Sequence, residues 1–237
     1  MTTGLTYSQY VTQIATMAVV EESNPAFVTI LPQMITYAEN RMYRDLNFMF
    51  TSTSISGYQI TPGSRTITIP EGTIVVLEQV NLLLPAGTQD PNQATRRPML
   101  PTTKEYLDAV YGVSSYTGPP CYFVPFNDNQ YLVGPFPDQS YYVEIIGTYR
   151  PASLSATNPT TFISLYLPDL FIMASMIYVS AYQRNFGRLN DDPQMAVTYE
   201  SQYMALLKGA QAEESRKTFE AAGWSSQAPS TSATPGR

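Results

Sequence analysis

The spacing of apolar residues changes twice along this 237-residue chain, and that change limits the folds it can adopt. Up to about residue 49 the apolar side chains follow a helical period, whereas from Phe50 they alternate, as in Thr66–Ile69. Helical spacing returns after Pro159. Strands enclosed by two groups of helices are typical of an α+β fold, so we expect a mainly antiparallel β domain inserted into a helical bundle.

These changes of period also predict the domain limits. We expect N-terminal helices of the bundle in residues 1–49, the inserted β domain in 50–156, C-terminal helices of the bundle in 157–222 and an extended tail in 223–237. The tail is rich in Ser, Thr, Pro and Ala, and such a segment cannot bury enough apolar area to order itself. We therefore expect another chain to hold it.

Helix ends are signalled by capping residues and prolines. Thr6, and Asn24 followed by Pro25, predict the starts of two helices, the second of which runs to about Asn47. The remaining signals are a capping box at Thr102–Glu105, a helix start at Pro168, a helix end at Gly187 with Arg184 and Arg188 beside it, and a cap at Asp191-Asp192-Pro193. In the last helix, Tyr199, Tyr203, Leu206 and Ala210 form the predicted apolar stripe.

Alternating segments predict five or six strands in the β domain. These segments cover residues 58–60, 66–69, 73–84, 121–126, 130–133 and 140–149. Pro62-Gly63 predicts a hairpin turn between the first two, and residues 85–98 read as a loop.

No residue pattern in the chain indicates catalysis. It contains no His, which removes the commonest general base and metal ligand, and its single Cys, Cys121, is expected to be a buried structural thiol. Adjacent acids such as Glu21-Glu22 point apart on a helix and are expected at caps and solvated faces. Arg96-Arg97 is expected to be a solvated loop doublet. We predict no enzyme, no catalytic residue, no metal and no cofactor.

The charge and aromatic content favour contacts with other proteins. Charged residues make up only 14% of the chain, the net charge is −6, and there are 18 Tyr. Tyr provides a large contact area at low entropic cost. Firm binding of DNA requires Lys and Arg at the phosphates, and the chain has few of either. The most apolar run, residues 170–182, is too short to span a bilayer and predicts a buried helix, so we expect no membrane contact.

Four aromatic residues are the candidates for a partner interface: Tyr199, Tyr203, Phe219 and Trp224. Trp224 is the only Trp and lies in the predicted tail, and interfaces are often anchored by Trp. The alternative for Trp224, a side chain folded back on its own helix, is equally compatible with its pattern.

Four segments, in order, carry a resemblance to a known family. They are LPQMITYAENRMYRDLN (31–47), YLVGPFPDQSYYVEIIGTYRPASLS (131–155), SLYLPDLFIMASMIYVSAYQRN (164–185) and DDPQMAVTYESQYMALL (191–207). Together they resemble the head-to-tail adaptor proteins of short-tailed bacteriophages, the tail tubular protein A group.

The resemblance implies a structural virion protein, made in the host cytoplasm and located at the head-to-tail junction. Such adaptors assemble as a dodecameric ring between the portal protein and the tail nozzle, and genomic DNA passes through without specific binding during ejection. It also implies no catalytic residues. The polar end of the last helix and the tail would then reach a neighbour, which we expect to be the portal.

Two other readings remain open at this point. A β domain rich in Tyr can stack sugars, so the chain could be a carbohydrate-binding or depolymerising tail component. It could also be a peptidoglycan hydrolase, which would need a carboxylic acid of raised pKa in a cleft.

Overall fold

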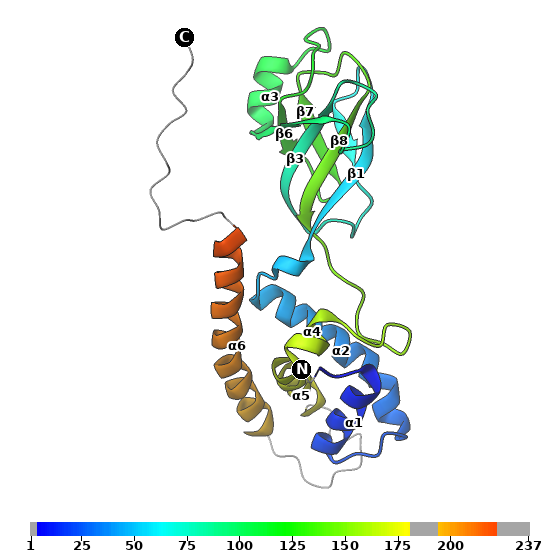
Figure 1. Cartoon of the computed structure of the whole chain (residues 1–237), viewed down its shortest axis with the longest axis vertical. Helices are drawn as coiled ribbons and strands as arrows, with labels where there is room; N and C mark the ends of the chain where they lie inside the picture. The colour runs from blue at the N-terminus through cyan, green and yellow to red at the C-terminus, as the bar shows by residue number, and fades with distance from the viewer. Residues whose placement is uncertain (1–3, 181–193, 222–237) are drawn as a thin grey trace. The chain divides into compact units, whose positions relative to one another are not determined.

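The computed structural model describes residues 4–180 and 194–221, and the chain divides into two compact units (Figure 1). The helical unit comprises Met1–Met49 and Ala152–Arg237, and the β unit comprises Phe50–Pro151. The expected mixed α+β fold is confirmed. The predictions for residues 184–193, for Trp224 and for the tail lie outside the described residues.

The helical unit contains α1 (Tyr7–Ala18), α2 (Pro25–Asp45), α4 (Phe162–Tyr166), α5 (Pro168–Ser180) and α6 (Gln194–Ala221). The predicted cap of α1 is confirmed, because the Thr6 side chain accepts the Gln9 backbone N–H while the Gln9 side chain accepts the Thr6 backbone N–H. The cap of α2 is confirmed as well: Asn24 accepts backbone N–H groups from the first turn, and Pro25 opens the helix.

Helix α5 forms the centre of the helical unit. It contacts α1, α2, α4 and α6 and is apolar on nearly all sides, as expected for a buried helix. The ring of Tyr10 on α1 stacks on Phe171 of α5 with centroids 4.6 Å apart. The Tyr10 hydroxyl also forms a hydrogen bond with the Ser175 hydroxyl, and both groups are fully buried.

The β unit contains two four-stranded sheets. Their strands are β1 (Ser52–Ile60), β2 (Thr66–Thr68), β3 (Val76–Leu84), β4 (Thr95–Pro98), β5 (Leu100–Pro101), β6 (Tyr122–Pro125), β7 (Gln130–Gly134) and β8 (Tyr141–Thr148). One sheet has the order β1-β8-β3-β4 and the other β2-β7-β6-β5. All pairings are antiparallel except that of β5 with β6.

Apolar side chains from both sheets form one shared core, so the sheets pack face to face. This core includes Ile60, Leu82 and Val143 of the first sheet and Ile67 and Val133 of the second. Helix α3 (Lys104–Tyr111) covers the other face of the second sheet, where Leu107 packs against Val124 and Leu132.

Three predictions for the β unit were wrong. Pro62-Gly63 does not close a hairpin, because β1 pairs with β8 and β2 with β7. Ile60 and Ile67 both point into the core between the sheets, so the turn carries the chain from one sheet to the other. The expected loop at 85–98 contains β4, and eight strands are formed rather than five or six.

Two smaller corrections concern helices. The N-cap of α3 is Thr103, one residue later than predicted. In α6, Leu207 is buried while Leu206 is 37% exposed, because the buried face continues through Ala210 to Glu214. No helix within residues 4–180 and 194–221 has both the length and the hydropathy needed to cross a membrane.

Candidate functional site

The described residues hold no arrangement suited to metal binding. Within the ranges 4–180 and 194–221 no three His, Cys, Asp or Glu side chains come together as a metal site. Cys121 is half-buried and receives a hydrogen bond from Arg97 Nη2 at 2.9 Å. The buried carboxylates Glu39, Glu144 and Glu214 are therefore the groups whose roles need explanation.

Glu144 joins the strands of the first sheet. Its carboxylate accepts hydrogen bonds from Ser54 Oγ at 3.0 Å, Asn81 Nδ2 at 3.0 Å and Arg96 Nε at 2.9 Å. Burial opposes its ionisation, but the bonds from Asn81, Arg96 and Ser54 outweigh burial and lower the pKa of Glu144. Arg96 is thus the partner of a buried acid on β8, and the expectation of a solvated loop charge was wrong for it.

Glu39 attaches the chain that follows the β unit to α2. Its Oε1 accepts the backbone N–H of Leu154 at 3.0 Å, and its Oε2 has no hydrogen-bond partner among the described residues. Burial raises the pKa of Glu39, although a bond with the Ser153 side chain and the Leu154 amide oppose that rise. The group lies in the interior of the helical unit.

Helices α2 and α6 are held together by a cluster of charges. Arg41 donates two hydrogen bonds to the Glu200 carboxylate, at 2.7 and 2.5 Å. It also lies 4.4 Å from the centre of the Tyr203 ring, and the Tyr203 hydroxyl donates to Asp45 at 2.7 Å. The predicted pair of Arg41 with Asp45 is present at 3.5 Å.

The four predicted interface residues have different environments. Tyr203 is buried inside the α2–α6 contact, where its hydroxyl donates to Asp45. Tyr199 is half-buried, and Phe219 is 51% exposed. Trp224 lies outside the described residues. Among the three that lie in the described residues, Phe219 is therefore the most exposed.

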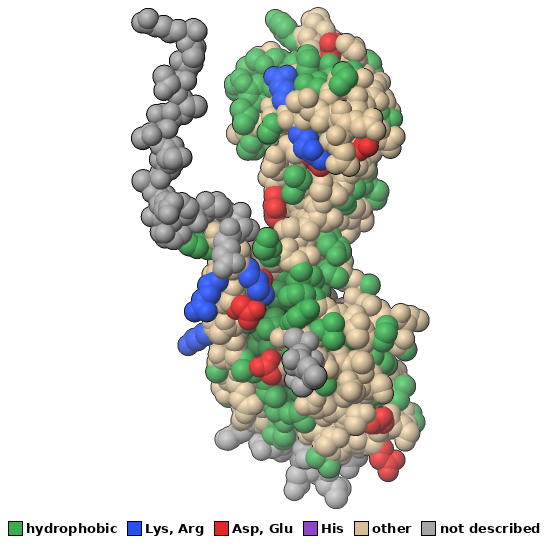
Figure 2. Space-filling view, viewed as in Figure 1, with side chains coloured by type: hydrophobic (Ala, Val, Ile, Leu, Met, Phe, Trp, Pro, Cys, Tyr) green, Lys and Arg blue, Asp and Glu red, His purple; other side chains and the backbone are tan. Residues whose placement is uncertain are grey.

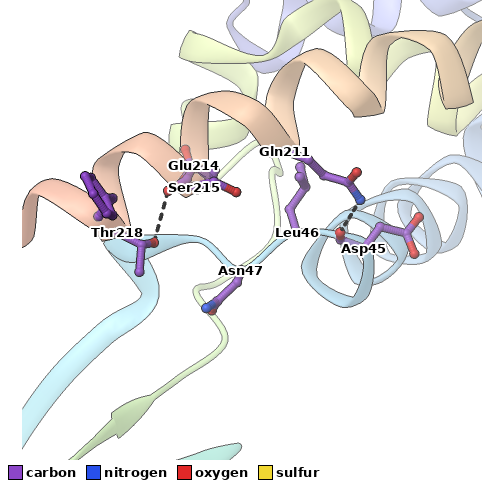
Figure 3. A pocket seen from close by; sticks show the side chains of 8 residues that line it. Asp45, Leu46, Asn47, Gln211, Glu214, Ser215 and Thr218 are labelled. Atoms are coloured by element: carbon purple, nitrogen blue, oxygen red, sulfur yellow. Dashed lines mark hydrogen bonds between the residues drawn. The ribbon is translucent and has the colours of Figure 1, made fainter. Parts of the chain in front are cut away.

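Phe219 borders a groove of about 620 Å³ between α6 and the segment that follows α2 (Figure 3). The groove is lined by Asp45, Leu46, Asn47, Gln211, Glu214, Ser215, Thr218 and Phe219. Gln211 donates to the Asp45 backbone carbonyl at 3.2 Å, which fixes one wall. Glu214 accepts the Met49 backbone N–H at 3.3 Å and Lys217 Nζ at 2.7 Å, which fixes the other.

Helix α6 also presents a line of exposed side chains to solvent. Val197, Met204, Lys208, Ser215 and Phe219 are separated by seven, four, seven and four positions, a spacing that keeps them on one side of a helix. We call these five residues the α6 outer stripe. Val197 is 68% exposed and Met204 44%, so the stripe has three large apolar side chains open to solvent. The sequence shows this spacing, but it does not reveal that the buried face of α6 lies elsewhere.

A comparison with protein families gives one match over nearly the whole chain. The family model described as SU10 adaptor protein matches residues 5–228. A comparison with curated proteins finds no match.

Proposed function

Because the chain belongs to the SU10 adaptor protein family of bacteriophage head-to-tail adaptors, we propose that it forms a ring that joins the portal to the tail nozzle. It is a bacteriophage adaptor protein and a structural component of the virion. The family match across residues 5–228 is the observation that carries the proposal. In such a ring the chain forms part of the DNA conduit.

The charges support a conduit that DNA passes without specific binding. The net charge is −6. Five of the basic side chains are already paired with carboxylates: Arg41, Arg65, Arg96, Lys104 and Lys217. Phosphate contacts depend on available Lys and Arg, so these five pairs and the negative net charge both weaken any hold on a DNA backbone. A filter-binding assay with duplex DNA at low salt is expected to show no retention, and tight retention would contradict a passive conduit.

The division into two units suits a ring protein, since a head-to-tail ring requires two different faces on each subunit. We assign the ring contacts to the helical unit. The β unit offers a separate hollow of about 590 Å³, beside which Val75, Val76 and Phe126 are each about half exposed. Exposed apolar patches of this kind mark contacts with other proteins. We assign this hollow to a neighbouring virion protein, the tail nozzle in the proposed assembly.

We assign the polar end of α6 and residues 223–237 to the contact with the portal. The composition of the tail motivates this assignment, since such a segment orders only on a partner. A chain that lacks residues 223–237 is expected to keep its circular dichroism spectrum and to lose much of its attachment to purified portal. Unchanged attachment would contradict the assignment. Trp224→Ala in the full chain is the finer variant, because it tests the proposed anchor alone.

The aromatic cluster formed by α3 and β6 is a poor platform for stacking sugars. Sugar stacking needs an open, flat aromatic face, but Tyr106 meets Tyr122 edge-on at 67°, with centroids 5.6 Å apart. Tyr122 is itself tilted against Tyr111. The three rings therefore pack on one another. Tyr fluorescence that stays unchanged during a titration with host surface polysaccharide is the expected result.

A further inference from the structure

The described residues of the helical unit leave much of the α6 outer stripe open to solvent, above all Val197, which is 68% exposed, and Met204, which is 44% exposed. Val197, Met204 and Phe219 are about half exposed or more, and they extend over 22 positions, a helix length of about 33 Å. Apolar side chains that line up along a helix in this way usually pack on another element. The groove beside Leu46 continues the stripe at its Phe219 end.

A second exposed apolar region lies at the turn between α1 and α2. We call Val19, Glu21, Glu22 and Val28 the α1–α2 turn face. Val19 is 68% exposed and Val28 is 53% exposed. Val19 also ends α1 with a left-handed backbone, at φ 56°, which is unfavourable for a β-branched residue and is normally left to Gly or Asn. The Val19 backbone N–H bonds to carbonyls of the last turn of α1 and so closes the helix end, but its exposed side chain adds nothing to the core.

The charges that lack an ion pair in the described residues are positive on α6 and negative at the α1–α2 turn face. On α6, Lys208 lies in the stripe and Arg216 follows Ser215, and neither has an ion-pair partner in the described part of the chain. Glu21 and Glu22 are likewise exposed and without an ion pair in residues 4–180 and 194–221. Acids near the start of α2 also interact favourably with the helix dipole, but that effect does not require the two exposed Val side chains beside them.

The two regions also lie on different sides of the helical unit. In Figure 1 α6 and the α1–α2 turn lie on opposite sides of α5, and α5 contacts both α1 and α6. Figure 2 shows basic side chains over α6 with acidic ones among them, and further acidic side chains at the opposite edge of the same unit. Complementary patches on opposite sides of one subunit are what a head-to-tail contact between copies requires.

We infer that neighbouring copies contact through these two regions, with the α6 outer stripe of one subunit packed on the α1–α2 turn face of the next. This inference rests on the proposed ring. Val19 and Val28 pack on Val197 and Met204, while Glu21 and Glu22 pair with Lys208 and Arg216. The contact is heterologous, so the same pair of surfaces is used at every junction of a closed ring.

Charge reversal on each face tests this contact. The two variants are Glu21→Lys/Glu22→Lys and Lys208→Glu/Arg216→Glu, each mixed with purified portal, and ring formation is followed by light scattering over a range of subunit concentrations. Each variant alone places like charges at the junction. We expect the concentration for half-maximal assembly to rise by about tenfold or more.

Rescue separates a broken contact from a folding defect. In an equal mixture, a ring in which the two variants alternate pairs opposite charges at every junction. A ring built only from the variant that carries all four substitutions also pairs opposite charges at every junction. Both are expected to assemble within about threefold of wild type, as complementary charges are restored. Glu71→Lys/Glu78→Lys is the control: it makes the same charge change on exposed residues of the β unit and is expected to assemble normally.

Four results would overturn the inference. Normal assembly of each single-face variant would show that the faces do not meet. Loss of assembly without rescue would assign the α6 outer stripe to the portal. Loss of assembly by the β-unit control as well would show that net charge, not this contact, controls assembly. If wild-type protein forms no ring on portal, the proposed function itself fails, whereas the first three results leave it standing.

Discussion

Arg41 of α2 and Glu200 of α6 lie 159 positions apart and form a two-pronged ion pair, with N–O distances of 2.7 and 2.5 Å. The pair connects the helices before the β unit to the last helix after it. Such bidentate pairs are stronger than single hydrogen bonds, and Lys cannot reproduce their geometry.

Glu200→Gln is expected to lower the free energy of unfolding by about 1 kcal/mol, since the pair is partly exposed and solvent screens it. Urea titration measures this loss. The control is Lys104→Gln, which breaks an exposed pair with Asp108 on α3 and is expected to cost about 0.3 kcal/mol. Equal effects at the two sites would show that the Arg41 pair has no special role.

The same pair predicts a pH dependence. The hydrogen bond from Arg41 lowers the pKa of Glu200 below its ordinary value near 4.5. A carboxyl whose pKa is lower in the folded state contributes its full stabilisation above the unfolded pKa, and this contribution is lost as pH falls through the folded pKa. The difference in unfolding free energy between wild type and Glu200→Gln should therefore shrink in acid. A difference that stays constant between pH 7 and pH 3 would contradict this.

Glu39 predicts the opposite trend. Burial raises its pKa in the folded state, so the folded protein binds this proton more tightly than the unfolded chain does. Ionisation then costs stability once pH rises above the unfolded pKa. We expect Glu39→Gln to be more stable than wild type at pH 8, without that advantage at pH 4, because Gln retains an acceptor for the Leu154 N–H. Urea titrations at the two pH values measure both differences, and an advantage confined to acid would show that the sign is wrong.

The buried hydroxyls of Tyr10 and Ser175 predict an asymmetry. Ser175 also donates to the Phe171 carbonyl at 2.8 Å, so Tyr10→Phe leaves it with a partner and should cost about 1 kcal/mol. Ser175→Ala leaves the Tyr10 hydroxyl buried without that bond and should cost more, about 2 kcal/mol. Adding Tyr10→Phe to Ser175→Ala should then recover stability. A further loss in the double variant, measured by thermal or urea unfolding, would contradict this assignment.

Val19 is expected to separate stability from assembly. Val19→Gly removes a Val from an unfavourable left-handed conformation. Gly also gives the unfolded chain more conformational entropy, which offsets part of this gain. We therefore expect the free energy of unfolding to rise by about 0.5 kcal/mol. It also removes an apolar side chain from the proposed subunit contact, so ring formation on portal should weaken. Val113→Ala, at a similarly exposed position in the β unit, is the control and should leave assembly unchanged. A Val19→Gly protein that is more stable and assembles equally well would remove Val19 from the interface.

The sequence predicted well those features that depend on neighbouring residues. The Thr6 and Asn24 caps and the start at Pro168 each involve a backbone within a few residues of the signal, and all were confirmed. Buried α5 was also predictable, because no side of it is polar.

Features that depend on distant partners were not predictable in this way. The residues at Pro62-Gly63 are typical of a hairpin turn. The structure instead pairs β1 with β8, which follows it by some 80 positions, and not with β2. Likewise Arg96 reads as a loop charge until β4 places it beside Glu144. The burial of Tyr203 depends on Arg41 and Asp45 of α2, so an interface role and a core role look alike in the sequence.

The mass of the purified protein, measured by light scattering alone and after addition of purified portal, tests the adaptor assignment most directly. We predict a complex with the mass of the portal plus a full ring of subunits. A protein whose mass is the same with and without portal would contradict the proposed ring.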